Sequence, residues 1–191
     1  METLAALLDR LDDDRVRRGR EFERICEWFL GAAATYRHDL QRVWLWNEWP
    51  GRWGADAGID LVAEDRQGRL WAIQAKAYAE TGTVTKADVD TFLSESNRPE
   101  FSFRLLIATT NRLAPNARRV IAAQEKPVGV LLRGDLERAE VSWPASPDHF
   151  RASPLEPKRP RPHQAEAVDA VLAGFEVSDR GQLVMACGTG K

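Results

Sequence analysis

The chain of 191 residues is long enough for one substantial domain and part of a second. Its 43% hydrophobic and 29% charged residues are typical of a globular protein, and its net charge of −2 excludes the strongly basic, histone-like class of proteins. The sequence shows no apolar run near the roughly 20 residues that cross a bilayer and no basic region of a secretory signal. Two distant cysteines, Cys26 and Cys187, favour a reducing cytoplasm over a disulfide or zinc framework.

The hydrophobic pattern of the first 132 residues predicts one helix region, three strands, and then helices alternating with strands. The turn residues and the apolar spacing place helices over 4–20 and 19–30, strands over 42–49, 58–64 and 69–77, a helix over 85–97, a strand over 103–109, a helix over 115–124 and a strand over 127–132. Thr85 and Asp88 have the positions of a helix N-cap and its capping partner. This order predicts a mixed α/β domain whose sheet is covered on both faces.

The composition changes after Val141. Six of the ten prolines lie between Pro144 and Pro162, which predicts a semi-rigid extended linker rather than a packed core. We therefore expect a first domain over 1–141, a linker over 142–162, and the start of a second domain over 163–191, with a helix at 163–172 and a strand at 181–186.

The predicted hairpin at 58–77 holds the most informative residues. Gln74 and Lys76 share one strand face with apolar neighbours, an arrangement that needs an explanation. A three-residue loop with Gly68 in the left-handed conformation places Asp60 opposite Gln74, whereas a two-residue loop places Asp60 opposite Ala75 and turns it to the other face. In the first register a carboxylate, an amide oxygen and an amine converge, which suits a hard cation and a developing negative charge on a phosphate.

Asp60, followed by thirteen residues and then Gln74-Ala75-Lys76, resembles the PD-(D/E)xK nuclease motif. The segments Gly58-Ile-Asp-Leu-Val-Ala63 and Ala72-Ile-Gln-Ala-Lys-Ala-Tyr78 are similar to Mrr-like restriction endonucleases. The resemblance implies a restriction-endonuclease-like α-β-β-β-α-β core with a mixed central sheet flanked by helices. It also implies that Asp60, Gln74 and the Ala75 carbonyl bind Mg²⁺, with Mn²⁺ as a substitute, and that Lys76 is the catalytic lysine.

The same resemblance implies further site residues. Glu23, on the helix at 19–30, matches a glutamate that approaches the metal site and joins the catalytic set. The stretch at 107–118 resembles the segment after the fourth strand of Mrr-like enzymes, and the candidates for DNA contact are Thr109, Asn111 and Arg112, together with Tyr78. Gln74 stands where the general motif has an acid. Mrr-like members carry this glutamine, yet a decayed site is the alternative, and an ordinary turn or surface role is open for Asp60 and Glu23.

The C-terminal residues resemble the beginning of a superfamily 2 helicase. Met185-Ala-Cys-Gly-Thr-Gly-Lys191 is similar to a Walker A motif, in which Gly188, Gly190 and Lys191 contact the phosphates of ATP, and Gln164 has the position of the adenine-reading residue. The motif stops before the Ser or Thr that holds Mg²⁺, so the resemblance implies ATP use by a longer protein only. The layout is similar to that of Type ISP restriction enzymes, in which a methyltransferase region follows the helicase.

We therefore expect a metal-dependent endonuclease that cuts double-stranded DNA in phage defence, in the bacterial cytoplasm and with no membrane partner. The first alternative is a catalytically silent nuclease fold that binds DNA or docks another protein, which a titration with divalent metal distinguishes. The second is an ATPase whose N-terminal domain is a protein-interaction platform, for which salt-dependent DNA binding would be missing. RNA as the substrate also stays open.

Overall fold

The computed structural model describes residues 2–54, 58–79, 81–145 and 161–182. They belong to two compact units, residues 1–153 and residues 154–191, and each unit is described by itself. No helix in these ranges is both long enough and apolar enough to cross a membrane.

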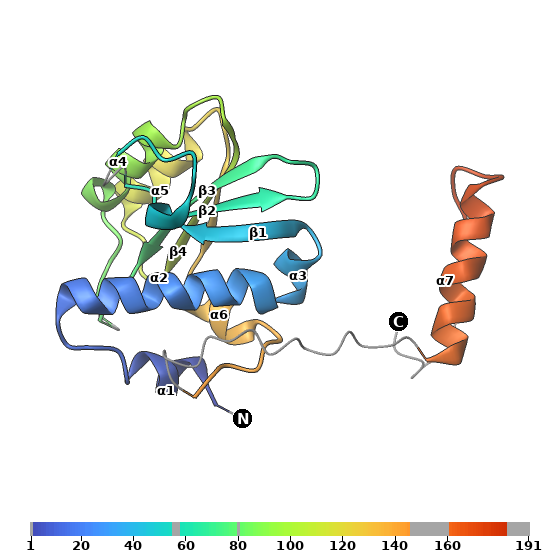
Figure 1. Cartoon of the computed structure of the whole chain (residues 1–191), viewed down its shortest axis with the longest axis horizontal. Helices are drawn as coiled ribbons and strands as arrows, with labels where there is room; N and C mark the ends of the chain where they lie inside the picture. The colour runs from blue at the N-terminus through green and yellow to red at the C-terminus, as the bar shows by residue number, and fades with distance from the viewer. Residues whose placement is uncertain (1, 55–57, 80, 146–160, 183–191) are drawn as a thin grey trace. The chain divides into compact units, whose positions relative to one another are not determined.

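The first unit is built on a five-stranded mixed sheet in the order β1-β2-β3-β4-β5 (Figure 1). The first three strands pair antiparallel, while β3 with β4 and β4 with β5 pair parallel. This topology confirms the predicted α-β-β-β-α-β core. The elements are α1 (Leu4–Leu8), α2 (Arg15–Ala32), α3 (Ala34–Arg37), β1 (Leu40–Leu45), the short 3₁₀ helix η1 (Trp46–Glu48), β2 (Leu61–Asp65), β3 (Leu70–Lys76), α4 (Lys86–Glu95), β4 (Phe101–Ala108), α5 (Pro115–Ala122), β5 (Val128–Leu131) and α6 (Arg133–Arg138).

Both faces of the sheet are buried, as the element order predicted. The helix α2 lies along one face and the helices α4 and α5 cover the other (Figure 1). Strand β3 shows the alternation that this requires: Ile73 belongs to the core beneath α2, and Ala72 belongs to the core beneath α4. The end of β3 therefore brings side chains from both layers close to one edge of the sheet.

The structure departs from the expected elements in four ways. The strand expected at 58–64 begins only at Leu61, so Asp60 precedes β2. The single helical region at 4–30 is interrupted between α1 and α2, because the Asp14 carboxylate caps α2 by accepting the N–H groups of Val16 and Arg17 at 3.1 and 3.0 Å. The strand expected at 42–49 ends at Leu45 and continues as η1. The Trp46 indole then donates to the Gly54 carbonyl at 3.0 Å, which closes the following loop back on η1. The short helices α3 and α6 are additions that the hydrophobic pattern did not indicate.

The first unit also extends slightly beyond its predicted end at residue 141. Trp143 is buried and stacks on Phe29 of α2 with ring centroids 5.7 Å apart. In the second unit, α7 spans Pro162–Phe175, so the helix expected at 163–172 is confirmed. Most of the linker, nearly all of the strand expected at 181–186, and the candidate phosphate-binding residues Gly188, Gly190 and Lys191 lie outside the described residues.

Candidate active site

The hairpin between β2 and β3 has the register that the three-residue loop predicted. Leu61 pairs with Ile73, as that loop requires, but the ladder ends there: the Asp60 N–H, one residue earlier, donates to the same Ile73 carbonyl at 2.9 Å instead of pairing opposite Gln74. The Asp65 N–H donates to the Arg69 carbonyl at 3.0 Å, and Gly68 has a φ of 75°, the left-handed conformation that glycine adopts without strain.

The carboxylate of Asp65 holds this turn. It accepts the N–H groups of Gln67 and Arg69 at 3.0 and 2.9 Å and the Arg69 guanidinium at 2.7 Å. Although burial alone would raise the pKa of Asp65, these hydrogen bonds outweigh it and lower that pKa. The turn that sets the pairing of β2 with β3 is therefore fixed by side-chain bonds as well as by Gly68.

Asp60 departs from the strand alternation that the sequence suggested. Ile59 and Val62 both belong to the core beneath α4, so the regular alternation of β2 does not extend back to Asp60. Instead the Asp60 Oδ2 accepts the backbone N–H of Ala75 at 2.7 Å, across the hairpin. Because the N–H and C=O of one strand residue point to the same side, the Ala75 carbonyl faces the Asp60 side as well. The expectation that Asp60 and Gln74 share one sheet face is corrected: Asp60 reaches across the hairpin rather than into the core beneath α4.

Gln74 is buried and held in one orientation. Its side chain is 2% exposed, and its Nε2 donates to the Gly58 carbonyl at 3.0 Å. That bond fixes which end of the amide is the oxygen, and within the described part of the chain the buried Oε1 has no hydrogen-bond donor. A buried oxygen without a donor costs about 1–3 kcal/mol, so a cation is the kind of partner this atom suits.

Gly58 is a supporting residue that the sequence analysis did not identify. It has a φ of 64°, and a Cβ at this position would lie 2.8 Å from the Thr91 Cγ2 and 3.2 Å from the Phe92 nitrogen on α4. Only glycine fits there, and its carbonyl is the acceptor that orients Gln74. The one sign of this role in the sequence was that a glycine lies two residues before Asp60.

Lys76, at the end of β3, lies among acidic groups from both helical layers. Burial first, and the Asp60 carboxylate second, raise the pKa of Glu23 on α2 to about 7, while Lys76 counteracts this rise. On α4, burial would raise the pKa of Asp88, but two hydrogen bonds from Thr85, at 2.8 and 2.6 Å, and the charge of Lys76 lower it. The charges of Asp60, just before β2, and of Lys76, at the end of β3, therefore both act on Glu23 of α2.

The three groups expected to bind the metal ion are chemically suited to a hard cation. The Asp60 carboxylate, the Gln74 Oε1 and the Ala75 carbonyl are all oxygens, which Mg²⁺ and Mn²⁺ prefer. The buried Oε1 that lacks a donor is the observation in the structure that favours such a ligand. Across residues 2–54, 58–79, 81–145 and 161–182, no three His, Cys, Asp or Glu side chains form a metal-binding group. The proposed ligand set contains one carboxylate, so it is not of that kind.

The residues expected to contact DNA are placed very differently from one another. Asn111 and Arg112 are exposed, although the Asn111 Oδ1 accepts the Gly134 N–H at 2.7 Å and the Arg112 guanidinium donates to the Thr81 carbonyl at 3.0 Å. Tyr78 is half-buried, and burial followed by the nearby Asp88 raises the pKa of its hydroxyl. Thr109 is 3% exposed, and its hydroxyl is bonded to the backbone of Tyr78, so the structure argues against a DNA contact by Thr109.

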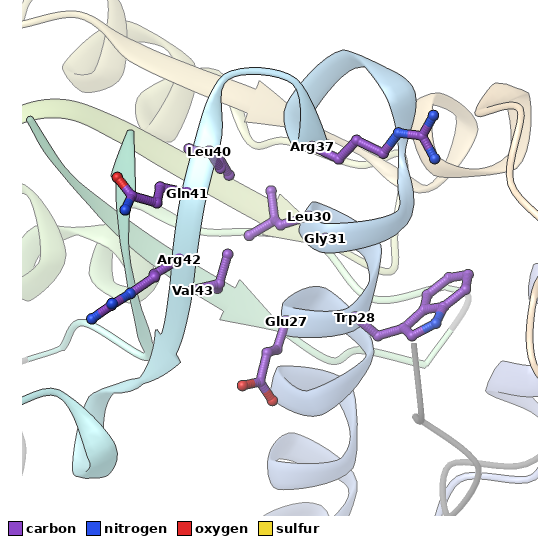
Figure 2. A pocket seen from close by; sticks show the side chains of 9 residues that line it. All are labelled: Glu27, Trp28, Leu30, Gly31, Arg37, Leu40, Gln41, Arg42 and Val43. Atoms are coloured by element: carbon purple, nitrogen blue, oxygen red, sulfur yellow. The ribbon is translucent and has the colours of Figure 1, made fainter. Parts of the chain in front are cut away.

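A pocket of about 400 Å³ lies away from these residues, between the end of α2 and the edge strand β1 (Figure 2). Figure 2 shows Glu27 and Trp28 on α2 and Gln41 and Arg42 on β1. Burial first, and Glu48 second, raise the pKa of Glu27. The lining contains no residue of the candidate active site; it consists of Glu27, Trp28, Leu30, Gly31, Arg37, Leu40, Gln41, Arg42 and Val43.

The raised pKa of Glu23 predicts a pH-dependent gain in stability for Glu23→Gln. The folded protein holds the Glu23 proton up to pH about 7, whereas the unfolded chain releases it near pH 4.5, so the wild type loses stability as the pH rises between these values. Glu23→Gln removes that loss. We expect the variant to unfold at a higher temperature than wild type at pH 8 and at the same temperature near pH 4, in thermal unfolding with EDTA. The exposed control Glu125→Gln should show no such pH-dependent difference, and an equal difference at both pH values for Glu23→Gln would contradict the assignment.

Gln74→Glu supplies the acid of the general motif and is nevertheless expected to destabilise the metal-free protein. The carboxylate cannot donate to the Gly58 carbonyl, and it places a charge at a position that is 2% exposed. We expect a loss of about 1–3 kcal/mol in urea unfolding with EDTA, largely recovered when Mg²⁺ is added. The matched change Gln67→Glu lies in the exposed turn and should stay within about 0.5 kcal/mol of wild type. A Gln74→Glu protein as stable as wild type without metal would mean that the amide orientation is not needed.

Comparisons with known proteins place this domain among nucleases. A family model described as a restriction endonuclease matches residues 32–150, a range that includes Asp60, Gln74 and Lys76 but not Glu23. A solved structure of the ATP-dependent Type ISP restriction-modification enzyme LlaBIII bound to DNA matches over 100% of this chain, with 31% identity and a TM-score of 0.69. The chain spans 12% of that enzyme's length.

Two more solved structures match part of this chain. The DNA modification-dependent restriction endonuclease AspBHI is 17% identical, and the match covers 69% of this chain and 32% of that one, with a TM-score of 0.43. The MspJI restriction endonuclease in complex with a 27-mer oligonucleotide is 22% identical, and the match covers 70% of this chain and 30% of that one, with a TM-score of 0.44. No curated protein sequence matches the chain.

Proposed function

The chain belongs to the restriction endonuclease family with an Mrr-type catalytic domain, and on that premise we propose that its first domain hydrolyses phosphodiester bonds of double-stranded DNA with Mg²⁺, or Mn²⁺ as a substitute. The observation that carries the proposal is the buried Gln74 Oε1, which lacks a hydrogen-bond donor and belongs to the residue before Ala75, whose N–H the Asp60 carboxylate accepts. An oriented amide oxygen, and a carboxylate bonded to the next residue of the same strand, form the start of a ligand set for a hard cation.

Each proposed role follows from a residue's chemistry and position. Asp60, Gln74 and the Ala75 carbonyl would hold the metal ion, which when bound polarises the phosphate and activates water. The Lys76 ammonium is a compact charge that stabilises negative charge developing on the phosphate. Glu23, with a pKa of about 7, takes up and releases a proton near neutral pH, which suits it to accept a proton during the hydrolysis.

The exposed face of α2 supports a polyanionic substrate. Arg20 and Arg24 are exposed, and their charges act on Glu23, so they lie beside the proposed site. Arginine contacts to phosphates supply affinity without reading sequence. We therefore propose that this domain binds DNA through its backbone, and that sequence recognition lies elsewhere in a longer protein.

The wider context is also a proposal. The similarity to the Type ISP enzyme extends over the whole chain, including α7, and supports a nuclease domain joined to an ATP-dependent helicase region, with methyltransferase regions further along the same protein. In that arrangement Gln164 on α7 would contribute to ATP binding, together with Gly188, Gly190 and Lys191. The proposed location is the bacterial cytoplasm, where such an enzyme meets foreign DNA.

The rival function is a catalytically silent nuclease fold that binds DNA, with Gln74 as the mark of a lost acid. Isothermal titration of the chain with Mn²⁺ separates the two. The proposed nuclease should show a binding site that Asp60→Asn abolishes and that the exposed control Asp13→Asn keeps. Equal heats for wild type and Asp60→Asn would favour the silent fold.

A further inference from the structure

The backbone of the chain around Lys76 is held by one buried hydroxyl. Thr109, directly after β4, donates its N–H to the Lys76 carbonyl at 3.1 Å. Its Oγ1 accepts the Tyr78 N–H at 2.7 Å and donates to the Tyr78 carbonyl at 2.9 Å. The Thr109 hydroxyl thus both accepts and donates a hydrogen bond at the backbone of Tyr78, two residues after Lys76. Thr109 is 3% exposed.

This position matters because the regular ladder ends here. The pairing of β3 with β2 stops at Ile73, and the pairing with β4 stops at Lys76 and Ala108. On the β2 side the Asp60 carboxylate bonds the Ala75 N–H in place of a backbone partner. On the β4 side the corresponding bonds beyond Lys76 come from Thr109. The proposed catalytic lysine therefore stands on the last paired residue of its strand.

We infer that Thr109 is a positioning residue, whose hydroxyl fixes the backbone after Lys76 and thereby the direction in which the Lys76 ammonium reaches the scissile phosphate. This inference rests on the proposed function, since it assigns Thr109 a part in the reaction that Lys76 serves. It also replaces the DNA contact expected for Thr109 from the sequence, because the hydroxyl already serves the protein backbone.

The chain offers a closely matched control next to Thr109. Thr110 is 1% exposed, and its Oγ1 donates to the Gly82 carbonyl at 2.6 Å, so it too ties the segment after β3 to the segment after β4. The bond of Thr110 lies six residues beyond Lys76, whereas the bonds of Thr109 lie two residues beyond it. Threonine-to-valine changes at the two sites remove the same buried group, and only one of them affects the backbone next to the lysine.

The test compares wild type, Thr109→Val, Thr109→Ser and Thr110→Val in single-turnover cleavage of a plasmid at saturating protein. Thr109→Val should cut about 10- to 100-fold more slowly, which is the size of effect expected from a small misplacement of a reacting group. Its affinity for duplex DNA in Ca²⁺ should stay within about twofold of wild type, because the hydroxyl is not a DNA ligand. Thr109→Ser, which keeps the hydroxyl, should recover most of the rate, and Thr110→Val should cut nearly as fast as wild type despite a similar fall in unfolding temperature.

A second measurement does not depend on cleavage. The chain has only five lysines, so protein labelled with ¹³C at lysine Cε gives few signals, and the Lys76 signal is identified by its loss in Lys76→Ala. Thr109→Val should shift or broaden the Lys76 signal, whereas Thr109→Ser and Thr110→Val should leave it in place.

The outcomes separate the two proposals. If the wild type does not cut, the proposed function fails, and the lysine spectra alone decide the role of Thr109. An unchanged Lys76 signal in Thr109→Val overturns the positioning role. A wild-type rate in Thr109→Val overturns it as well, and so does a rate equally reduced in Thr109→Ser or in Thr110→Val.

Discussion

Lys76→Ala is expected to slow single-turnover plasmid cleavage by about 100- to 1,000-fold, the usual loss when one group that stabilises transition-state charge is removed. Lys76 is half-exposed at the end of β3, so its removal opens no core cavity, and the free energy of unfolding should change by about 0.5 kcal/mol or less. Binding of duplex DNA in Ca²⁺ should persist. Rates of nicking, measured beside urea unfolding of the same samples, separate the loss of chemistry from a loss of fold.

Two further variants sharpen this result. Lys76→Arg should also fail, because the planar guanidinium does not replace a compact ammonium at a confined position. Lys86→Ala removes a more exposed lysine, on α4, that pairs with Asp90 at 2.6 Å, and it should cut like wild type. Wild-type cleavage by Lys76→Ala would mean that another residue stabilises the phosphate.

Asp60→Asn is expected to abolish metal-dependent cleavage, with a loss on the order of 1,000-fold or more, because it removes the carboxylate of the proposed ligand set. The asparagine oxygen can still accept the Ala75 N–H, so the hairpin contact that Asp60 makes at 2.7 Å is preserved and the charge alone is lost. The same change lowers the pKa of Glu23, since Asp60 contributes to its rise. The measurement is the cleavage rate as a function of Mg²⁺ concentration, next to the exposed control Asp13→Asn.

If Asp60→Asn only weakened metal affinity, its cleavage rate would depend on the Mg²⁺ concentration in a different way. If Asp60→Asn reached the wild-type rate at high Mg²⁺, Asp60 would contribute to metal affinity alone and not to the reaction. A lower rate at every Mg²⁺ concentration agrees with Asp60 as a ligand that acts in the reaction.

The hairpin register was predictable because it depends on local residues. The position of Gly68 selects the loop length, and the loop length sets the pairing of β2 with β3 as far as Leu61 and Ile73. The departure of Asp60 from this register was not predictable in the same way. It depends on Ile59 entering the core beneath α4, which is a contact between segments far apart in the sequence.

The hydrogen bond that orients Gln74 was likewise not predictable from local sequence. Gly58 is tied to its conformation by Thr91 and Phe92, more than thirty residues later, and a local pattern contains no information on that packing. Thr109 is the clearest case of a residue whose type suggested one role and whose burial indicates another. A threonine directly after a strand suits a phosphate contact. The Thr109 hydroxyl, however, is buried and makes its hydrogen bonds with the Tyr78 backbone. Glu23 was placed near the site only by resemblance, and the structure adds that burial and Asp60 raise its pKa to about 7.

The central claim is that this domain is a metal-dependent nuclease built on Asp60. It is tested most directly by incubating supercoiled plasmid with wild type and with Asp60→Asn at high protein concentration, in Mg²⁺, in Mn²⁺ and in EDTA. We predict nicked or linear plasmid with the wild type in either metal, and intact plasmid with EDTA or with Asp60→Asn. Plasmid that stays supercoiled with the wild type in both metals, or cleavage that continues equally in EDTA and with Asp60→Asn, would contradict the claim.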